Sequence, residues 1–174
     1  YVLIAVILAV IVLSLTMDSA LIPVFFLLSI GMAIIYNLGS NVFFGEISYV
    51  TQALAAVLQL GVTMDYSIFL LDAYMNWRDT GLSEEEAIVK AVEEAINSIF
   101  ASSLTTVVGF LALVTMKFNI GFDMGLVLAK GIIFSLLTVV LFMPAMILKF
   151  TKWNDKTKHR SFFPDFTRLG LSLI

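Results

Sequence analysis

Long runs of apolar residues are the feature that most limits what this chain can fold into. A run of about 18 or more apolar residues can cross the hydrocarbon core of a bilayer as an α-helix. Of the 174 residues, 60% are hydrophobic and only 13% are charged, where an ordinary soluble domain has about 25% charged residues. We therefore expect an all-α fold, a polytopic transmembrane helix bundle whose five spans lie at about 1–16, 20–38, 49–73, 98–117 and 123–149.

The charged loop at 74–97 carries helix signals of its own. Gly81 is expected to end the preceding helix, and Ser83 stands three residues before Glu86, which is the spacing of a capping box. We expect an interfacial helix that starts here and continues into the fourth span.

The distribution of Lys and Arg predicts the orientation in the membrane. Short connections alternate sides, so the loop at 74–97 and the C-terminal tail share one side. The connections on the other side hold only Lys117. The positive-inside rule places the richer side in the cytoplasm and the N-terminus outside. The basic residues on the expected cytoplasmic side are Arg78, Lys90, Lys149, Lys152, Lys156, Lys158, Arg160 and Arg168.

The two ends of the sequence suggest an excerpt. Tyr1 already lies inside an apolar run, and no basic stretch or cleavage site marks a signal peptide. We expect at least one further helix upstream. Residues 151–174 mix basic and aromatic side chains, which predicts an amphipathic cytoplasmic linker at the inner leaflet that leads toward a missing next helix.

Asp65 is a carboxylate inside the third apolar run, about 4–5 Å from its middle at the rise of an α-helix. A charge at that depth costs about 2.5–3.5 kcal/mol on insertion scales, so such residues face protein and often mark proton or ion paths. Burial favours the protonated form. The alternative is a purely structural role for Asp65, as one hydrogen bond that holds two helices together.

Three neighbours of Asp65 share its helix. Tyr66 supplies a hydroxyl, but consecutive residues point about 100° apart, so both side chains are expected to reach other helices. Gly61 lies one turn earlier on the Asp65 face and would admit a close helix. Asp72 shares that face at the membrane boundary, where a structural role is the simpler interpretation.

Lys130 is the second intramembrane charge. Asp123 lies seven residues earlier on the same helix face, so the ammonium can snorkel outward toward Asp123 or the headgroups. The functional alternative is a counter-ion for Asp65 or for a carboxylate of a partner.

Small and hydroxylated residues recur in the fourth span. Ser102 with Thr106, and Thr105 with Gly109, are pairs of small residues four positions apart, a spacing that favours close helix contact in lipid. Thr105 and Thr106 are the hydroxyls that we expect first as hydrogen-bond partners of Asp65.

Several classes of function are disfavoured. The chain has no cysteine, and its one histidine, His159, lies in the charged tail, so we expect no metal site. No phosphate loop is present, so we expect neither a cofactor nor an enzyme. No basic stripe with interleaved aromatic residues lies outside the tail, so we expect no nucleic-acid partner.

Four segments together resemble the RND superfamily and, within it, the MMPL branch. They are Gly-Val-Thr-Met-Asp-Tyr at 61–66, Gly-Leu-Ser-Glu-Glu-Glu-Ala at 81–87, Ala-Ser-Ser-Leu-Thr-Thr at 101–106 and Leu-Phe-Met-Pro-Ala-Met at 141–146. The resemblance covers most of the chain from about residue 20. It implies helices two to six of one six-helix repeat.

The resemblance also implies a function. Family members export lipids or hydrophobic, drug-like compounds at the expense of the proton-motive force, and Asp65 and Tyr66 match the family's proton relay. It implies a second repeat whose own Asp-Tyr pair faces this one, with membrane lipids and a hydrophobic substrate as the other partners. Lys130 is outside the matched motif. Sodium coupling stays open, because a buried carboxylate can serve either ion.

Two other classes of membrane protein share this helix arrangement. A sensor like the sterol-sensing domains would bind lipid without proton dependence. A component like SecD or SecF would use proton flow to assist protein export, although its motifs differ around the buried acid. The Asp-Tyr dipeptide favours the exporter.

Overall fold

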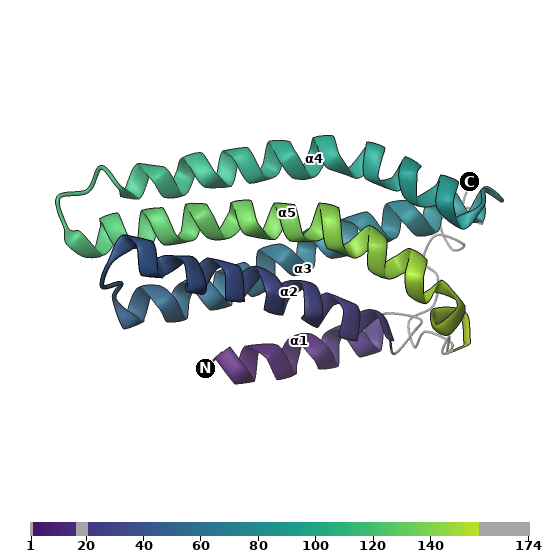
Figure 1. The fold of residues 1–174 in the computed structure, drawn as a ribbon, viewed down its shortest axis with the longest axis horizontal. Coiled ribbons are helices and arrows are strands. Elements are labelled where there is room, and N and C mark those ends of the chain that lie inside the picture. Colours follow the sequence, from purple (N-terminus) through teal and green to yellow (C-terminus); the bar gives the residue numbers. More distant parts are fainter. Residues whose placement is uncertain (1, 17–20, 157–174) are drawn as a thin grey trace, which may run out of the picture.

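The computed structural model describes residues 2–16 and 21–156, and within these residues it is helical throughout, without strands. Figure 1 shows long helices packed side by side in one elongated bundle. The elements are α1 (Val2–Thr16), α2 (Leu21–Gly39), the 3₁₀ helix η1 (Ser40–Phe44), α3 (Tyr49–Asp79), α4 (Glu84–Leu113) and α5 (Asn119–Lys156).

Four of the described helices, α2 to α5, are long and apolar enough to cross a membrane. The fifth expected span corresponds to α1, whose apolar part, Leu3–Leu13, is shorter than a full crossing. The all-helical class is confirmed, and the number of five spans stays a prediction.

Two helix boundaries differ from the expected ones. α4 ends at Leu113, four residues before the expected end of the fourth span, because the chain turns and the Thr115 hydroxyl donates to the Ala112 carbonyl oxygen (2.7 Å). α5 begins at Asn119 and extends to Lys156, so the first residues of the expected linker at 151–174 are helical. The rest of that linker lies outside the described residues.

Successive helices run in opposite directions, so the connections fall at the two ends of the bundle. The turn between α3 and α4 and the last part of α5 lie at one end, and the connections from α2 to α3 and from α4 to α5 lie at the other (Figure 1). This places the 74–97 segment and the end of α5 at a common end; the tail beyond Lys156 lies outside the described residues. Which end faces the cytoplasm stays a prediction.

An apolar core fills the bundle, with buried residues from each of the helices α1 to α5. Leu13, Phe26, Leu70, Val139 and Met143 are at most 1% exposed and belong to one contiguous cluster. Large apolar side chains also cover the outside of the bundle, for example Ile35 at 69% and Leu141 at 70% exposed. Such a surface is unfavourable in water and is what lipid contact requires.

The start of α4 has the expected capping box. Glu86 N–H donates to Ser83 Oγ (3.3 Å), Ser83 N–H donates to Glu86 Oε2 (3.2 Å), and the Ser83 hydroxyl also donates to Glu86 Oε2 (2.6 Å). Only residues 80–83 connect α3 to α4, and Gly81 among them adopts a φ of 88°. α4 is one uninterrupted helix, so the expected interfacial helix and fourth span are continuous. Its interfacial position stays a prediction.

The cap makes the first turn of α4 sensitive to pH. The hydrogen bonds from the Ser83 hydroxyl and then from the Ser83 N–H lower the pKa of Glu86 below its ordinary value. The stabilisation is therefore full above pH 4.5 and is lost as the pH falls through the lowered pKa. We expect the protection of the amides in the first turn of α4, measured against the intrinsic exchange rate at each pH, to fall at low pH. Ser83→Ala should lower this protection at neutral pH and reduce its pH dependence, whereas equal pH dependence of the protection in both proteins would contradict the cap.

Candidate functional site

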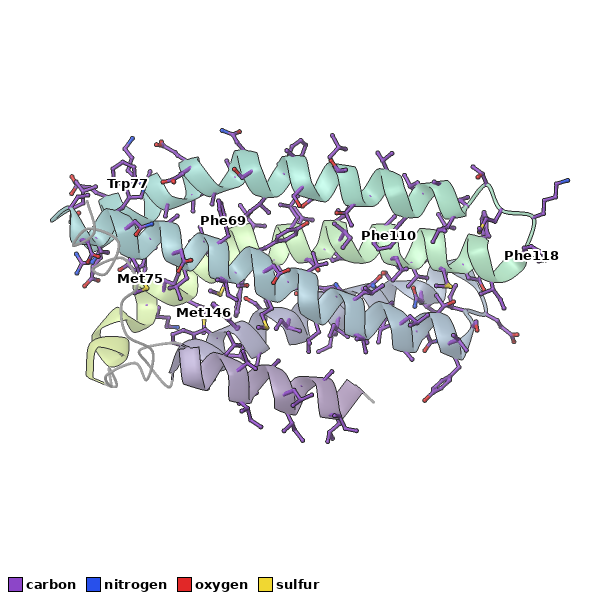
Figure 2. The ribbon with its side chains drawn as sticks, turned by 180° about the vertical axis from the view of Figure 1, so that it is seen from behind. Phe69, Met75, Trp77, Phe110, Phe118 and Met146 are labelled. Carbon is purple, nitrogen blue, oxygen red and sulfur yellow. The ribbon has the colours of Figure 1, made fainter. Side chains whose placement is uncertain are left out.

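Asp65 lies midway along α3, on the wall of a groove between α3 and α4. The groove has a volume of about 460 Å³, and the Asp65 side chain is exposed to it. Figure 2 shows Phe69 in the same space between the two helices. The lining residues are Val62, Asp65, Tyr66 and Phe69 from α3, and Ser98, Ile99, Ser102 and Thr106 from α4. We call this cavity the α3–α4 groove.

Tyr66 lines the groove and also takes part in the contact between α3 and α4. It is 7% exposed, and its hydroxyl lies 3.0 Å from the Oγ of Ser103, which is 3% exposed. Ser103 Oγ also lies 2.6 Å from the Ile99 carbonyl oxygen, which can only accept. Because a serine carries one hydroxyl proton, satisfying both contacts requires the Tyr66 hydroxyl to donate to Ser103. Both side chains line the α3–α4 groove, but Asp65 is exposed and Tyr66 is buried.

The two threonines expected near Asp65 bond to their own helix. Thr105 Oγ1 donates to the Ala101 carbonyl oxygen (3.0 Å), and Thr106 Oγ1 donates to the Ser102 carbonyl oxygen (2.9 Å). Thr106 lines the α3–α4 groove, and Thr105 is exposed. Among the residues that the structure describes, none donates a hydrogen bond to the Asp65 carboxylate. A partner for it stays a prediction.

Gly61 and Asp72 are also exposed on α3. A Cβ at Gly61 would meet nothing within 4 Å, and the same holds for Gly109 on α4. Close helix contact within this chain is therefore not what these two glycines provide. They stay candidates for contact with a helix outside this chain.

Lys130 lies far from Asp65. Its ammonium donates to Asn41 Oδ1 (2.7 Å) in η1, near the end of α2. Contacts from α3 to α5 join residues 72 positions apart, such as Thr63 with Ser135. Lys130 is therefore level with Leu58, which lies seven residues before Asp65 on α3. The two charged residues are thus separated by about 10 Å along the bundle. Within this chain the two charges do not pair.

A column of buried polar side chains lies between α2, α3 and α5. These residues are uncharged, and the sequence-based predictions considered mainly charged residues. Asn37 Nδ2 donates to Gln59 Oε1 (3.0 Å), and Gln59 Nε2 donates to the Gly131 carbonyl oxygen (3.1 Å). One turn further along, Thr63 Oγ1 donates to Ser135 Oγ (2.7 Å). A Cβ on Gly131 would lie only 2.6 Å from Asn37 Nδ2.

The signal for this column is the spacing of Gln59, Thr63 and Ser67, four residues apart inside an apolar run. Thr63 and Asp65 point about 200° apart on a helix. α3 therefore carries two polar faces, one that holds the bundle together and one that opens to the α3–α4 groove.

These features define a class of protein: a polytopic α-helical membrane protein with an acid midway along one of its long helices. The chain belongs to the MMPL family, whose family model matches residues 1–169.

Individual relatives agree with this assignment. Membrane protein MJ1562 of Methanocaldococcus jannaschii is 40% identical over 91 residues, or 52% of this chain and 24% of that protein. Membrane protein ActII-3 of Streptomyces coelicolor is 31% identical over 144 residues, or 81% of this chain and 20% of that protein. The probable transport protein MmpL12 of Mycobacterium tuberculosis is 32% identical over 92 residues, or 53% of this chain and 8% of that protein.

The matched segments thus span a quarter or less of these relatives. No solved structure matches the chain. The family makes this a membrane protein related to transport, as the resemblance implied.

Proposed function

We propose that this chain is part of the membrane domain of an exporter of lipids or hydrophobic compounds, driven by the proton-motive force, with Asp65 and Tyr66 in its proton relay. The observation that carries the proposal is the position of Asp65. Its carboxylate lies midway along a helix long enough to cross the membrane, and it faces the α3–α4 groove.

The chemistry follows from the cost of charge at that depth. An ionised carboxylate near the bilayer centre needs water, a cation or hydrogen-bond donors, whereas the protonated acid tolerates apolar packing. Protonation of Asp65 would therefore favour a tighter arrangement of helices, and deprotonation would favour a hydrated one. If the two arrangements open to opposite sides of the membrane, each cycle carries a proton inward and can drive a substrate outward.

Tyr66 would couple the protonation state of Asp65 to the position of α4. Its bond to Ser103 connects α3 to α4 at the depth of Asp65, so a change in the pairing of Asp65 can reach α4. The second repeat of the same transporter would contribute its own Asp-Tyr pair, facing Asp65 and Tyr66. Membrane lipids and the hydrophobic substrate would be the other partners.

Tyr66→Phe tests this coupling. We expect it to lower transport about tenfold, a smaller loss than removal of Asp65, because the ring still packs and only the hydroxyl bond is lost. Ser103→Ala removes the same bond from the other side and should give a similar loss. Tyr36→Phe, on α2, is the matched control for removal of a tyrosine hydroxyl. Normal transport in both Tyr66→Phe and Ser103→Ala would show that this bond is only structural.

Ion flux in proteoliposomes tests the proposed function itself. The full-length protein is reconstituted with a pH-sensitive dye inside the vesicles, and gradients of protons or of sodium are imposed separately. We expect a hydrophobic lipid substrate to accelerate proton flux, and a sodium gradient to have no effect. If the substrate accelerates ion flux only in a sodium gradient, the coupled ion is sodium and not the proton. Lipid binding without flux of either ion would favour a sterol-sensing type of module.

A further inference from the structure

The α3–α4 groove extends from Asp65 toward one end of the bundle. The bond between Tyr66 and Ser103 sets the register of the two antiparallel helices. Ser98, which lines the groove, therefore lies level with about residue 71 of α3. From the level of Asp65 the groove thus continues for about 9 Å, toward the end of the bundle that holds the turn between α3 and α4 (Figure 1).

Hydroxyl groups line this part of the groove. Ser98, Ser102 and Thr106 follow one another at intervals of four residues and share one face of α4. Ser98 and Ser102 are exposed, so their hydroxyls can donate to water and accept from it. The groove volume of about 460 Å³ has room for several waters, because one water needs about 10–15 Å³. The groove can therefore hold a chain of hydrogen-bonded waters.

Asp72 lies just beyond the lining residues, at about the level of Ser98. It follows Asp65 by seven residues, so the two residues share a face of α3, and Asp72 is exposed. If α3 is centred in the membrane, Asp72 lies about 12 Å from the midplane. The edge of the hydrocarbon core lies at about 15 Å. Asp72 therefore places a second carboxylate where the groove would meet the membrane boundary.

In the opposite direction from Asp65 the same two faces are apolar. Leu58 lies seven residues before Asp65 on α3 and is 41% exposed. On α4, Phe110 and Leu113 continue the face of Thr106, and Phe110 lies toward the end that holds the connection between α4 and α5 (Figure 2). Over the next two turns of the described helices, the polar lining thus continues toward only one end of the bundle.

We propose that this part of the α3–α4 groove is an aqueous half-channel that carries protons between Asp65 and the end with the α3–α4 turn, with Asp72 as the acceptor at its mouth. The proposal rests on the proton relay proposed above. Release breaks the O–H bond of protonated Asp65 and leaves its carboxylate. Waters held by Ser98 and Ser102 pass one proton to the Asp72 carboxylate, which gives it to bulk water. On the expected orientation this half-channel opens to the cytoplasm, and access from the other side comes from outside this chain.

Cysteine accessibility tests the half-channel without relying on transport. The chain has no cysteine, so single cysteines are introduced into the full-length protein after any others are replaced. A charged, membrane-impermeant thiol reagent is applied to vesicles of each orientation. We expect Ser98→Cys and Ser102→Cys to react only from the side of Thr80→Cys, which marks the turn. Val108→Cys, at a position that is 59% exposed on α4, should react from neither side. If Ser98→Cys and Ser102→Cys react from neither side, another helix seals the groove and the proposal is overturned.

Proton flux in proteoliposomes tests the role of Asp72. We expect Asp72→Asn to slow flux about tenfold, less than the roughly 100-fold that a positioned proton-transfer group can contribute, because water can replace part of its role. Asp72→Glu keeps a carboxylate and should restore most of the flux. Asp79→Asn, at the exposed end of α3, should leave flux unchanged.

The outcome for Asp65→Asn separates the two proposals. Normal flux in Asp72→Asn, together with loss of flux in Asp65→Asn, would overturn the half-channel with its acceptor and leave the proposed function standing. Flux that persists in Asp65→Asn would overturn the proposed function itself.

Discussion

Asp65→Asn in the full-length protein is expected to reduce export to the background of cells without the transporter. The amide has nearly the shape of the acid and can still form hydrogen bonds, but it cannot be charged. The proposed relay needs both protonation states at this depth, because only the change between them alters which helix arrangement is favoured. Export of a hydrophobic compound is measured in cells with and without a protonophore, and the protonophore should reduce wild-type export to the same background.

The matched control is Asp79→Asn, the same substitution at the exposed end of α3. It should leave export within about twofold of the wild type, since exposed changes away from such a site usually have small effects. The amount of folded protein in the membrane is compared for both variants. Normal export by a well-folded Asp65→Asn protein would remove the basis of the proposed function and make the acid structural.

Gly125→Ala is expected to give the largest loss of stability among glycine substitutions in the described helices. A Cβ at Gly125 would lie 2.7 Å from Val114 Cγ2, 2.8 Å from the Phe110 carbonyl oxygen and 2.9 Å from Val114 N. Two of these atoms belong to the backbone, so α4 and α5 must separate at their connected ends. Overpacking of this kind costs about 1–3 kcal/mol. The measurement is the fraction of full-length protein that stays monodisperse in detergent after heating.

Gly31→Ala is the control for this prediction. Gly31 lies inside α2, and a Cβ there would meet nothing within 4 Å. Alanine favours a helix over glycine by up to about 1 kcal/mol, so this variant should be as stable as the wild type or more stable. Equal heat resistance of Gly125→Ala and Gly31→Ala would mean that the close approach of α4 to α5 is not required.

Much of the helical framework follows from the sequence, because lipid enforces it. Without water to satisfy backbone groups, an apolar run must close its hydrogen bonds within itself, and helices are the result. The start of α4 is a local event as well, since Ser83 and Glu86 reach each other's backbone without help from another helix. The all-helical class and this cap could therefore be predicted, and so could the central position of Asp65 along α3.

The contacts between helices were decided by the tertiary structure. Small residues at 102, 105, 106 and 109 predicted close helix contact, yet a Cβ at Gly109 meets open space, and Gly125 and Gly131 are the glycines that neighbouring groups approach. Helix spacing identifies the residues that share a face, but it does not identify the neighbour of that face. The partner of Lys130 is likewise Asn41, 89 positions away.

The sequence by itself thus determined the helical class, the family motif and the central position of Asp65 along α3, because each depends on local order along the chain. Only the packing decided that Tyr66 bonds to Ser103, that Gln59 bridges Asn37 to Gly131, and that Asp65 opens onto a groove. The physical reason is that hydrogen bonds between helices depend on their rotation and relative height. Those quantities come from the fit of many side chains at once.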